Sequence, residues 1–240
     1  MPRRVSRGGD ENVCGLVCEI VNRNRRIGAI RLCIYKQGKL PFVAAKVKLA
    51  AKELRLSLRQ HGFWQSVLTI CWRDDSARSA LQRAIRHAAE HVEGAGLVRT
   101  LDVPRGKVNV ATFTRLIDLL RPDEALAIMS KVRLTNGRWA HLPMVDFACY
   151  DTDADLKKVL TALRALGHQS GAIVRSGNSF HFYCFQVMSE EEWLTSMARF
   201  LLLAPIVDVR YTAHRIIDRV CVLRLSGRGG SDEPVIAARL

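Results

Sequence analysis

The chain has 240 residues, of which 48% are hydrophobic, and a formal net charge of +14. This length allows one large domain or two small ones, because single domains usually hold about 100–200 residues. No run of about 18 apolar residues occurs, which argues against a membrane-spanning helix.

The N-terminus is basic but lacks the apolar segment that follows in a secretory signal. The seven cysteines form no C-x-x-C pair, and most lie inside apolar runs. This pattern favours reduced, buried thiols. We therefore expect a cytoplasmic protein with no membrane partner.

The first 60 residues carry most of the charge excess, with 14 Lys and Arg against 4 Asp and Glu, whereas the rest of the chain holds 23 against 19. A basic segment of this kind is typical of a surface that binds a polyanion. A solvated basic surface without a ligand has the same composition. An anionic membrane is a poorer partner, because no amphipathic helix with bulky aromatic residues accompanies the charge.

The predicted order begins with a basic, disordered arm over residues 1–12. We assign residues 13–125 to an N-terminal α/β module. Its strands are predicted at residues 13–20, 27–35, 66–72, 97–103 and 108–112, and its helices at residues 41–58, 75–91 and 113–120. The polar side of the first helix carries Lys46, Lys48 and Lys52, our candidates for contacts with nucleic acid.

Residues 126–240 form the second predicted domain. Asn136-Gly137 between two apolar runs predicts a hairpin of residues 128–134 and 139–149. The following elements are helix 153–166, strands 171–175 and 180–187, helix 189–202 and strand 221–225, the second helix beginning with a capping box.

Without the leading hairpin strand, this order is β-α-β-β-α-β, the split βαβ of ferredoxin-like and RNA-recognition-like sheets. The predicted fold class is therefore α+β, with a basic N-terminal α/β module packed on an RRM-like palm. Such a sheet serves many functions, so the fold by itself does not assign one.

Two polar residues interrupt apolar, strand-like runs of this domain. Asp146 follows Met144-Val145, and His181 stands between Phe180 and Phe182. Burying an isolated carboxylate is very costly, so each residue needs a partner. A local partner at the sheet edge would satisfy either residue alone. Because the predicted order makes their strands neighbours, the two residues together predict a site.

Four short motifs, in this order, resemble the archaeo-eukaryotic primase superfamily and its primase-polymerase palms. They are an apolar strand with Asp146, Ser176-Gly177 followed after three residues by His181, then Ile206-Val207-Asp208, and finally Arg224-Leu225-Ser226-Gly227. The resemblance covers about residues 140–235. It implies a nucleotidyltransferase of DNA replication that acts on nucleic acid, DNA or RNA, with NTP or dNTP and Mg²⁺ or Mn²⁺.

The resemblance also implies roles for single residues. Asp146 matches the first metal carboxylate, Asp208 the third, and His181 the nucleotide-binding histidine, so these three are the predicted catalytic residues and the two carboxylates the predicted metal ligands. Ser176, Gly177 and Arg224 match positions that contact phosphate, and with His181 they form the predicted nucleotide-binding set.

One position departs from the family pattern. The second carboxylate of the family falls on Ala148, which shares a strand face with Asp146. Two-metal phosphoryl transfer needs bridging carboxylates that hold both cations about 4 Å apart. Asp151 or Asp153 would substitute only if the strand ended early, and we expect both to cap the following helix instead.

Three interpretations remain open from the sequence. The first is an active primase or polymerase-like nucleotidyltransferase. The second is a catalytically degenerate protein of the same fold that binds nucleotide or nucleic acid without turnover, with a protein partner supplying the missing functions. The third is an unrelated domain in which Asp146 and His181 are structurally satisfied. The number of acidic side chains near Asp146 distinguishes the first two.

Overall fold

The computed structural model describes residues 12–36, 97–177, 179–227 and 233–240. The chain divides into two compact units, residues 37–96 and the remainder, and only the second is described below. The predicted helices at 41–58 and 75–91, the strand at 66–72, the arm up to residue 11, and Lys46, Lys48 and Lys52 all lie outside the described residues.

The described strands form two sheets. The large sheet has the order β2-β1-β3-β4, with β8 also paired to β3, and consists of β1 (Ile27–Lys36), β2 (Leu97–Pro104), β3 (Glu124–Leu134), β4 (Trp139–His141) and β8 (Val222–Arg224). The small sheet has the order β5-β7-β6-β9 and consists of β5 (Met144–Asp146), β6 (Gly171–Arg175), β7 (Phe180–Cys184) and β9 (Val235–Arg239). The α+β class is confirmed.

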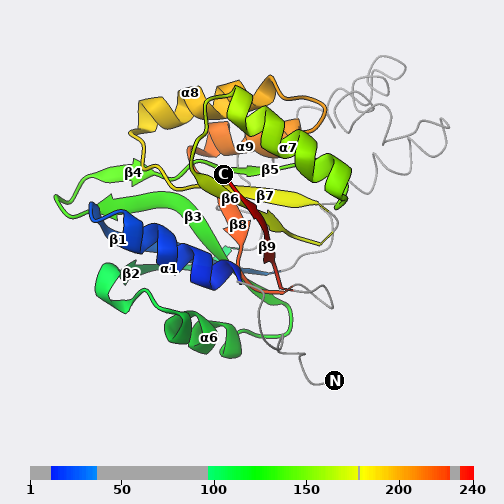
Figure 1. Ribbon diagram of the computed structural model, residues 1–240. Helices are drawn as coiled ribbons and strands as arrows, with labels where there is room; N and C mark the ends of the chain where they lie inside the picture. The colour runs from blue at the N-terminus through cyan, green and yellow to red at the C-terminus, as the bar shows by residue number, and fades with distance from the viewer. Residues whose placement is uncertain (1–11, 37–96, 178, 228–232) are drawn as a thin grey trace, which may run out of the picture. The chain divides into compact units, whose positions relative to one another are not determined.

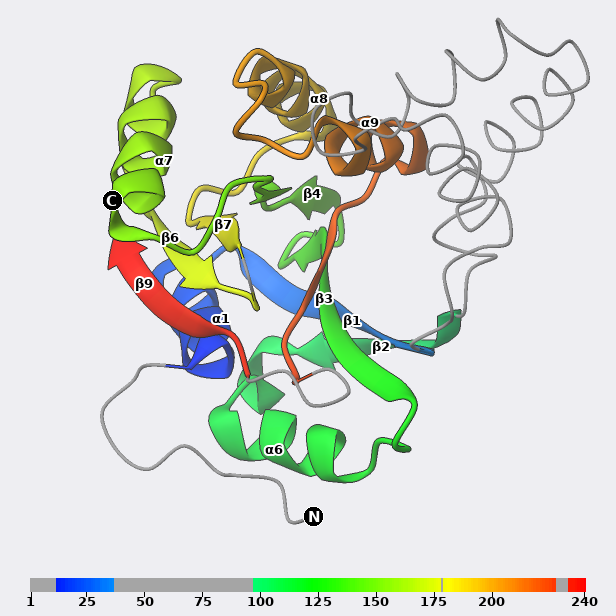
Figure 2. The same ribbon diagram turned by 90° about the vertical axis from the view of Figure 1, so that its right-hand side faces the viewer.

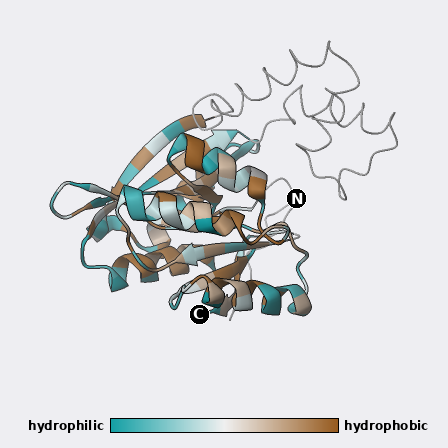
Figure 3. Ribbon diagram, turned by 90° about the horizontal axis from the view of Figure 1, so that it is seen from above, coloured by the Kyte–Doolittle hydropathy of each residue, from teal (hydrophilic) through white to brown (hydrophobic). Residues whose placement is uncertain are grey.

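Five α-helices accompany the sheets in the described ranges: α1 (Val13–Arg23), α6 (Val110–Asp118), α7 (Asp153–Ala165), α8 (Glu190–Leu201) and α9 (Val209–Asp218). Helices α7 and α8 lie on one side of the small sheet and α1 on the other (Figures 1 and 2). Apolar residues concentrate on the central strands, and the helices alternate hydrophilic and hydrophobic segments (Figure 3). None of these helices is long and apolar enough to cross a lipid bilayer.

The predicted strand at residues 13–20 is wrong, because these residues form helix α1. Its buried residues recur at helical spacing: Val13, Cys14, Leu16, Val17, Ile20 and Val21. Asn12 caps the N-terminus by accepting a hydrogen bond from Gly15 N at 2.9 Å. At the other end, Arg105 donates to carbonyl oxygens of Val21, Asn22 and Asn24. The two apolar runs on either side of the polar residues 22–26 suggested a pair of strands, but the spacing and the caps of the first run favour a helix.

The structure changes two further predictions. The strand expected at 108–112 is instead the start of α6, which Asn109 caps through Thr112 N at 2.8 Å. The single run at 139–149 divides into β4 and β5, which belong to different sheets. Pro143 lies between them and has no N–H to contribute to a continuous ladder.

Other predicted elements are confirmed. The β3–β4 hairpin turns at Asn136-Gly137, with Gly137 at φ +82°. Helix α7 and strands β2 and β6 lie close to their predicted bounds. Ser189 and Glu192 form the expected capping box of α8.

The split βαβ order is only partly formed. Strands β5, β7 and β6 are neighbours in the expected order, but β8 pairs with β3 in the large sheet, and β9, which was not predicted, occupies the outer edge of β6. Helix α9 was also not predicted. The boundary placed between residues 125 and 126 falls inside β3, which pairs along its length with β1.

Candidate functional site

Asp146 and His181 face each other across neighbouring strands. The register of β5 and β7 pairs the two residues directly, so their side chains leave the same face of the sheet. His181 Nε2 lies 3.5 Å from Asp146 Oδ1, and the two side chains are 10% and 32% exposed. The Asp146 side chain is therefore partly buried, whereas the imidazole is nearly enclosed.

Asp208 is brought to this pair by backbone contacts. Beyond β5 the chain stays extended, with a bridge between Phe147 and Val207 and a hydrogen bond from Ala148 N to Ile206 O at 2.8 Å. Asp208 N donates to Asp146 O at 3.0 Å. The Asp208 carboxylate also caps helix α9 by accepting from Tyr211 N at 2.8 Å. These contacts hold the Asp208 carboxylate next to that of Asp146.

The electrostatics of the pair are unusual. Burial, together with the charge of Asp208, raises the pKa of Asp146 to about 7. Burial, together with the charge of Arg224, lowers the pKa of His181 to about 3. At neutral pH His181 is therefore uncharged, and its contact with Asp146 is not an ion pair. In the described part of the chain, His181 Nδ1 is buried without a hydrogen-bond partner.

Arg224 and the Ser176-Gly177 turn complete the arrangement. Arg224 lies on β8, and its Nη2 donates to Ser176 Oγ at 3.1 Å. Gly177 has φ +76°, a conformation that side chains disfavour. A Cβ at this position would lie 3.6 Å from Arg224 Nη2. Glycine thus presents bare backbone beside a guanidinium, an arrangement that suits a phosphate group.

Ser179, which we had not singled out in the sequence, fastens this turn to β5. Its hydroxyl donates to Phe147 O, and its carbonyl accepts from Ser176 N at 2.9 Å. The turn that carries Ser176 is therefore tied to the strand that carries Asp146. A serine inside the Ser-Gly-x-x-x-His run was the only sequence signal for this link.

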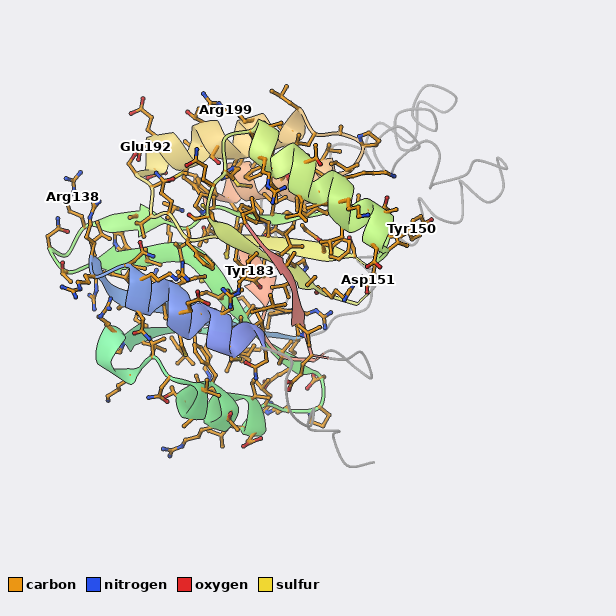
Figure 4. The ribbon with its side chains drawn as sticks, in the orientation of Figure 1. Arg138, Tyr150, Asp151, Tyr183, Glu192 and Arg199 are labelled. Carbon is orange, nitrogen blue, oxygen red and sulfur yellow. The ribbon has the colours of Figure 1, made fainter. Side chains whose placement is uncertain are left out.

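Few carboxylates stand near Asp146. Ala148 is exposed, and Asp151 and Asp153 pair with Arg175, at 2.6 Å and 3.5 Å. Asp151 and Asp153 were expected to cap α7, but the N-cap is Thr152, which lies between them. Asp153 lies in the first turn of the helix. Figure 4 shows Tyr150 and Asp151 at the outer end of this loop.

The two predicted metal ligands, Asp146 and Asp208, do not by themselves make a complete metal site. Among the described residues, no group of three or more His, Cys, Asp and Glu side chains converges as a metal site. The charge of Asp208 helps to raise the pKa of Asp146, and a cation between the two carboxylates would relieve that repulsion. A second ion would need the bridging carboxylate that Ala148 lacks.

A family model described as archaeo-eukaryotic primase 1D-like (AEP-like) matches residues 106–235. Comparisons with curated proteins and with solved structures gave no match.

Proposed function

The chain belongs to the archaeo-eukaryotic primase-like family, and from this premise we propose that it binds a nucleoside triphosphate with one divalent cation, Mg²⁺ or Mn²⁺, and transfers the nucleotide to a nucleic-acid strand. The observation that carries the proposal is the convergence of Asp146, His181, Asp208, Ser176 and Arg224. These residues come from four separate segments of the chain, since Ser176 and His181 belong to one turn and the strand that follows it.

Each side chain has a role that its chemistry supports. Arg224 and the backbone of Gly177 would bind phosphate oxygens, since a guanidinium and bare N–H groups are the preferred protein donors to phosphate. Ser176 Oγ holds the guanidinium in place at 3.1 Å. His181 Nε2 lies 3.5 Å from Asp146 Oδ1, so the imidazole would stand beside the bound triphosphate and contact it next to the cation.

Asp146 and Asp208 would hold the cation. A bound divalent ion neutralises charge on the reacting phosphate and orients it for attack by a hydroxyl group. The pKa of about 7 at Asp146 means that its carboxyl is only partly ionised at neutral pH. Cation binding requires the ionised form, so binding should strengthen as the pH rises from 6 to 8 and release a proton.

A second candidate is a protein that binds the triphosphate without turning it over. Ala148 favours it, because the family's second carboxylate is absent and Asp151 and Asp153 are engaged by Arg175. In this case, the site holds nucleotide and cation as a ligand-sensing or structural element.

Two measurements test the proposal. Equilibrium binding of labelled ATP, GTP and dNTPs, with and without Mn²⁺, examines the site itself, and a lack of cation-dependent binding would reject both candidates. Extension of primed and unprimed templates with Mg²⁺ or Mn²⁺ separates them. Product formation that is lost in Asp208→Asn supports transfer. Tight nucleotide binding without product supports the second candidate.

A further inference from the structure

A second polar cluster lies away from the triphosphate site, around Trp139 on β4. Trp139 is 45% exposed, which is unusual for the largest apolar side chain. Its ring is contacted by the guanidinium of Arg31, whose carbon lies 4.4 Å from the ring centroid. Arg31 in turn donates two hydrogen bonds to Asp102, at 2.7 Å and 2.9 Å. Asp102 therefore holds the guanidinium against the indole before any ligand arrives.

Further arginines surround this stack. Arg133 is the direct cross-strand partner of Trp139, and it lies near enough to Asp102 to help Arg31 lower the pKa of that carboxyl. Arg138 precedes Trp139 in the hairpin. The chain at Arg26 is joined to the same hairpin by a hydrogen bond from Thr135 N to Arg26 O at 2.8 Å. We call these six residues the Trp139 platform: Arg26, Arg31, Asp102, Arg133, Arg138 and Trp139.

The platform has a clear excess of positive charge, with four arginines against one aspartate. Arg26, Arg133 and Arg138 are exposed, and none of them forms an ion pair within the ranges that the structure describes. Figure 4 shows Arg138 at the outer tip of the hairpin, with Glu192 on the adjoining start of α8. Glu192 accepts hydrogen bonds from Ser189 in the capping box, and the charge of Arg26 helps to lower its pKa. This carboxylate therefore offsets part of the charge of Arg26, and arginines still outnumber the carboxylates around the platform.

We propose that the Trp139 platform binds single-stranded nucleic acid, with a base stacked on the indole and phosphates on the arginines. An exposed aromatic ring beside several arginines is the combination that single-strand binding surfaces use, because every base has a face that can stack. A duplex lacks exposed base faces and would engage only the arginines. A protein partner with an acidic surface would likewise contact the arginines, but its carboxylates would not stack on the indole.

The position of the platform suits a strand that reaches the triphosphate site. Trp139 and Asp146 are seven residues apart, so extended chain spans at most about 24 Å between them. A helical strand covers that distance in roughly seven nucleotide steps. The inference deepens the proposed function and rests on it for the role of the strand as template or primer, but binding itself is independent of the triphosphate.

Fluorescence anisotropy with labelled DNA and RNA oligonucleotides of about 16 nucleotides tests the proposal, since this is the upper site size of one single-strand binding fold. Trp139→Ala should weaken binding about tenfold, the loss expected for one stacked base. Trp139→Phe should retain most of the affinity, because a phenyl ring still stacks. Comparing the DNA and RNA arms identifies which strand is preferred.

Charge is tested separately from stacking. The double variant Arg133→Gln/Arg138→Gln should lower the slope of log affinity against log salt by about 1.4, at about 0.7 per phosphate contact. The matched control is Arg164→Gln/Arg199→Gln, which removes two exposed arginines from α7 and α8 and should leave the slope nearer to wild type.

Three outcomes would overturn the proposal. One is unchanged affinity in folded Trp139→Ala, another is an equal loss in the control variant, and the third is a duplex that loses as much affinity as the single strand when Trp139 is replaced. If Trp139→Ala does not fold, Trp139→Phe and the two double variants still decide the matter. Nucleotide binding measured without oligonucleotide should be normal in all platform variants, so failure here is distinguishable from failure of the triphosphate site.

Discussion

Two histidines on the described strands, His141 and His181, are buried, and their surroundings differ in an informative way. His141 on β4 is 1% exposed, contacts Ser130 Oγ through Nδ1 at 3.2 Å, and stacks on Trp193 with ring centroids 4.5 Å apart. His181 on β7 is 8% exposed, but its Nδ1 has no partner in the described ranges, and its Nε2 faces a carboxylate that is itself disfavoured when ionised.

The difference distinguishes a histidine that is buried for structural reasons from one that lies in a candidate ligand-binding site. A buried polar atom without a partner costs about 1–3 kcal/mol, and a carboxylate pair without a cation adds mutual repulsion. The region of His141 has no such deficit at its imidazole. Around His181, an unpartnered nitrogen and a repelling pair of carboxylates lie side by side. This is expected where a ligand supplies the missing partners.

The comparison predicts that the largest effect follows from Asp146→Asn. Loss of one of the two proposed cation ligands should weaken Mn²⁺-dependent nucleotide binding by about 100-fold or more, since even indirect partners of a metal ligand are worth about 10–100-fold. Calorimetric Mn²⁺ titration with and without nucleotide measures the change. The charge-matched control Asp123→Asn alters an exposed turn residue and should bind normally.

The folding of Asp146→Asn provides an internal check. The pKa of Asp146 is raised in the folded chain from about 3.8 to about 7. The contribution of Asp146 to the free energy of unfolding is thus most favourable below pH 3.8, and it is lost as the pH rises through 7. The asparagine variant should be at least as stable as wild type at pH 8. A variant that is both less stable and still able to bind Mn²⁺ would mean that Asp146 is a structural residue.

The next effect is the acid sensitivity of the His141 region. Burial, together with the charge of Lys131, lowers the pKa of His141 from 6.5 to about 4. The unfolded chain then binds the proton more readily, so stability is fully present above pH 6.5 and is lost as the pH falls towards 4. The difference of 2.5 pKa units corresponds to about 3 kcal/mol.

Urea unfolding at several pH values tests this effect. His141→Phe should flatten the dependence of the unfolding free energy on pH between 6.5 and 4. His181 contributes in the same direction and Asp146 in the opposite one, so the comparison of wild type with His141→Phe isolates the single residue. An identical pH dependence in both proteins would contradict the prediction.

A smaller effect distinguishes the two histidines when each is replaced by phenylalanine at pH 8. His141→Phe keeps the stacking but removes one partner of the Ser130 hydroxyl, which still accepts a hydrogen bond from Cys221 N at 2.9 Å, and should cost about 1 kcal/mol. His181→Phe removes an unpartnered nitrogen and should cost less than this or nothing. Thermal or urea unfolding gives both values. If His181→Phe lowers the free energy of unfolding more than His141→Phe does, the unpartnered nitrogen of His181 does not destabilise the folded protein.

The smallest predicted effect concerns Ala148→Asp. Position 148 is exposed and lies two residues beyond Asp146 in extended chain, so the new carboxylate should cost less than about 1 kcal/mol in stability. It should strengthen Mn²⁺ binding about tenfold and raise nucleotidyl transfer, because a third carboxylate completes the set that the family uses. Unchanged Mn²⁺ affinity in folded Ala148→Asp would show that this face is not the metal face.

Local sequence patterns determined several parts of this protein. The Asn-Gly hairpin, the capping box of α8 and the strand at Gly171–Arg175 follow from short-range preferences that tertiary contacts did not override. The pairing of Asp146 with His181 was also foreseeable, because two antiparallel neighbours with one polar residue each have few registers that keep the apolar residues buried. The order of the motifs was sufficient to indicate the primase-like family.

Long-range contacts decided the rest. The helical assignment of α1 depends on burial against β9 and α6 and on the cap from Arg105, which lies 82 residues beyond Arg23. The pairing of β8 with β3, rather than with β5, placed Arg224 beside Ser176 from a different sheet. Neither contact can be predicted from the hydrophobic periodicity of its own segment, since a hydrogen bond between distant residues constrains only the two positions that form it. The sequence thus indicated the candidate site residues, and the tertiary structure decided how they meet.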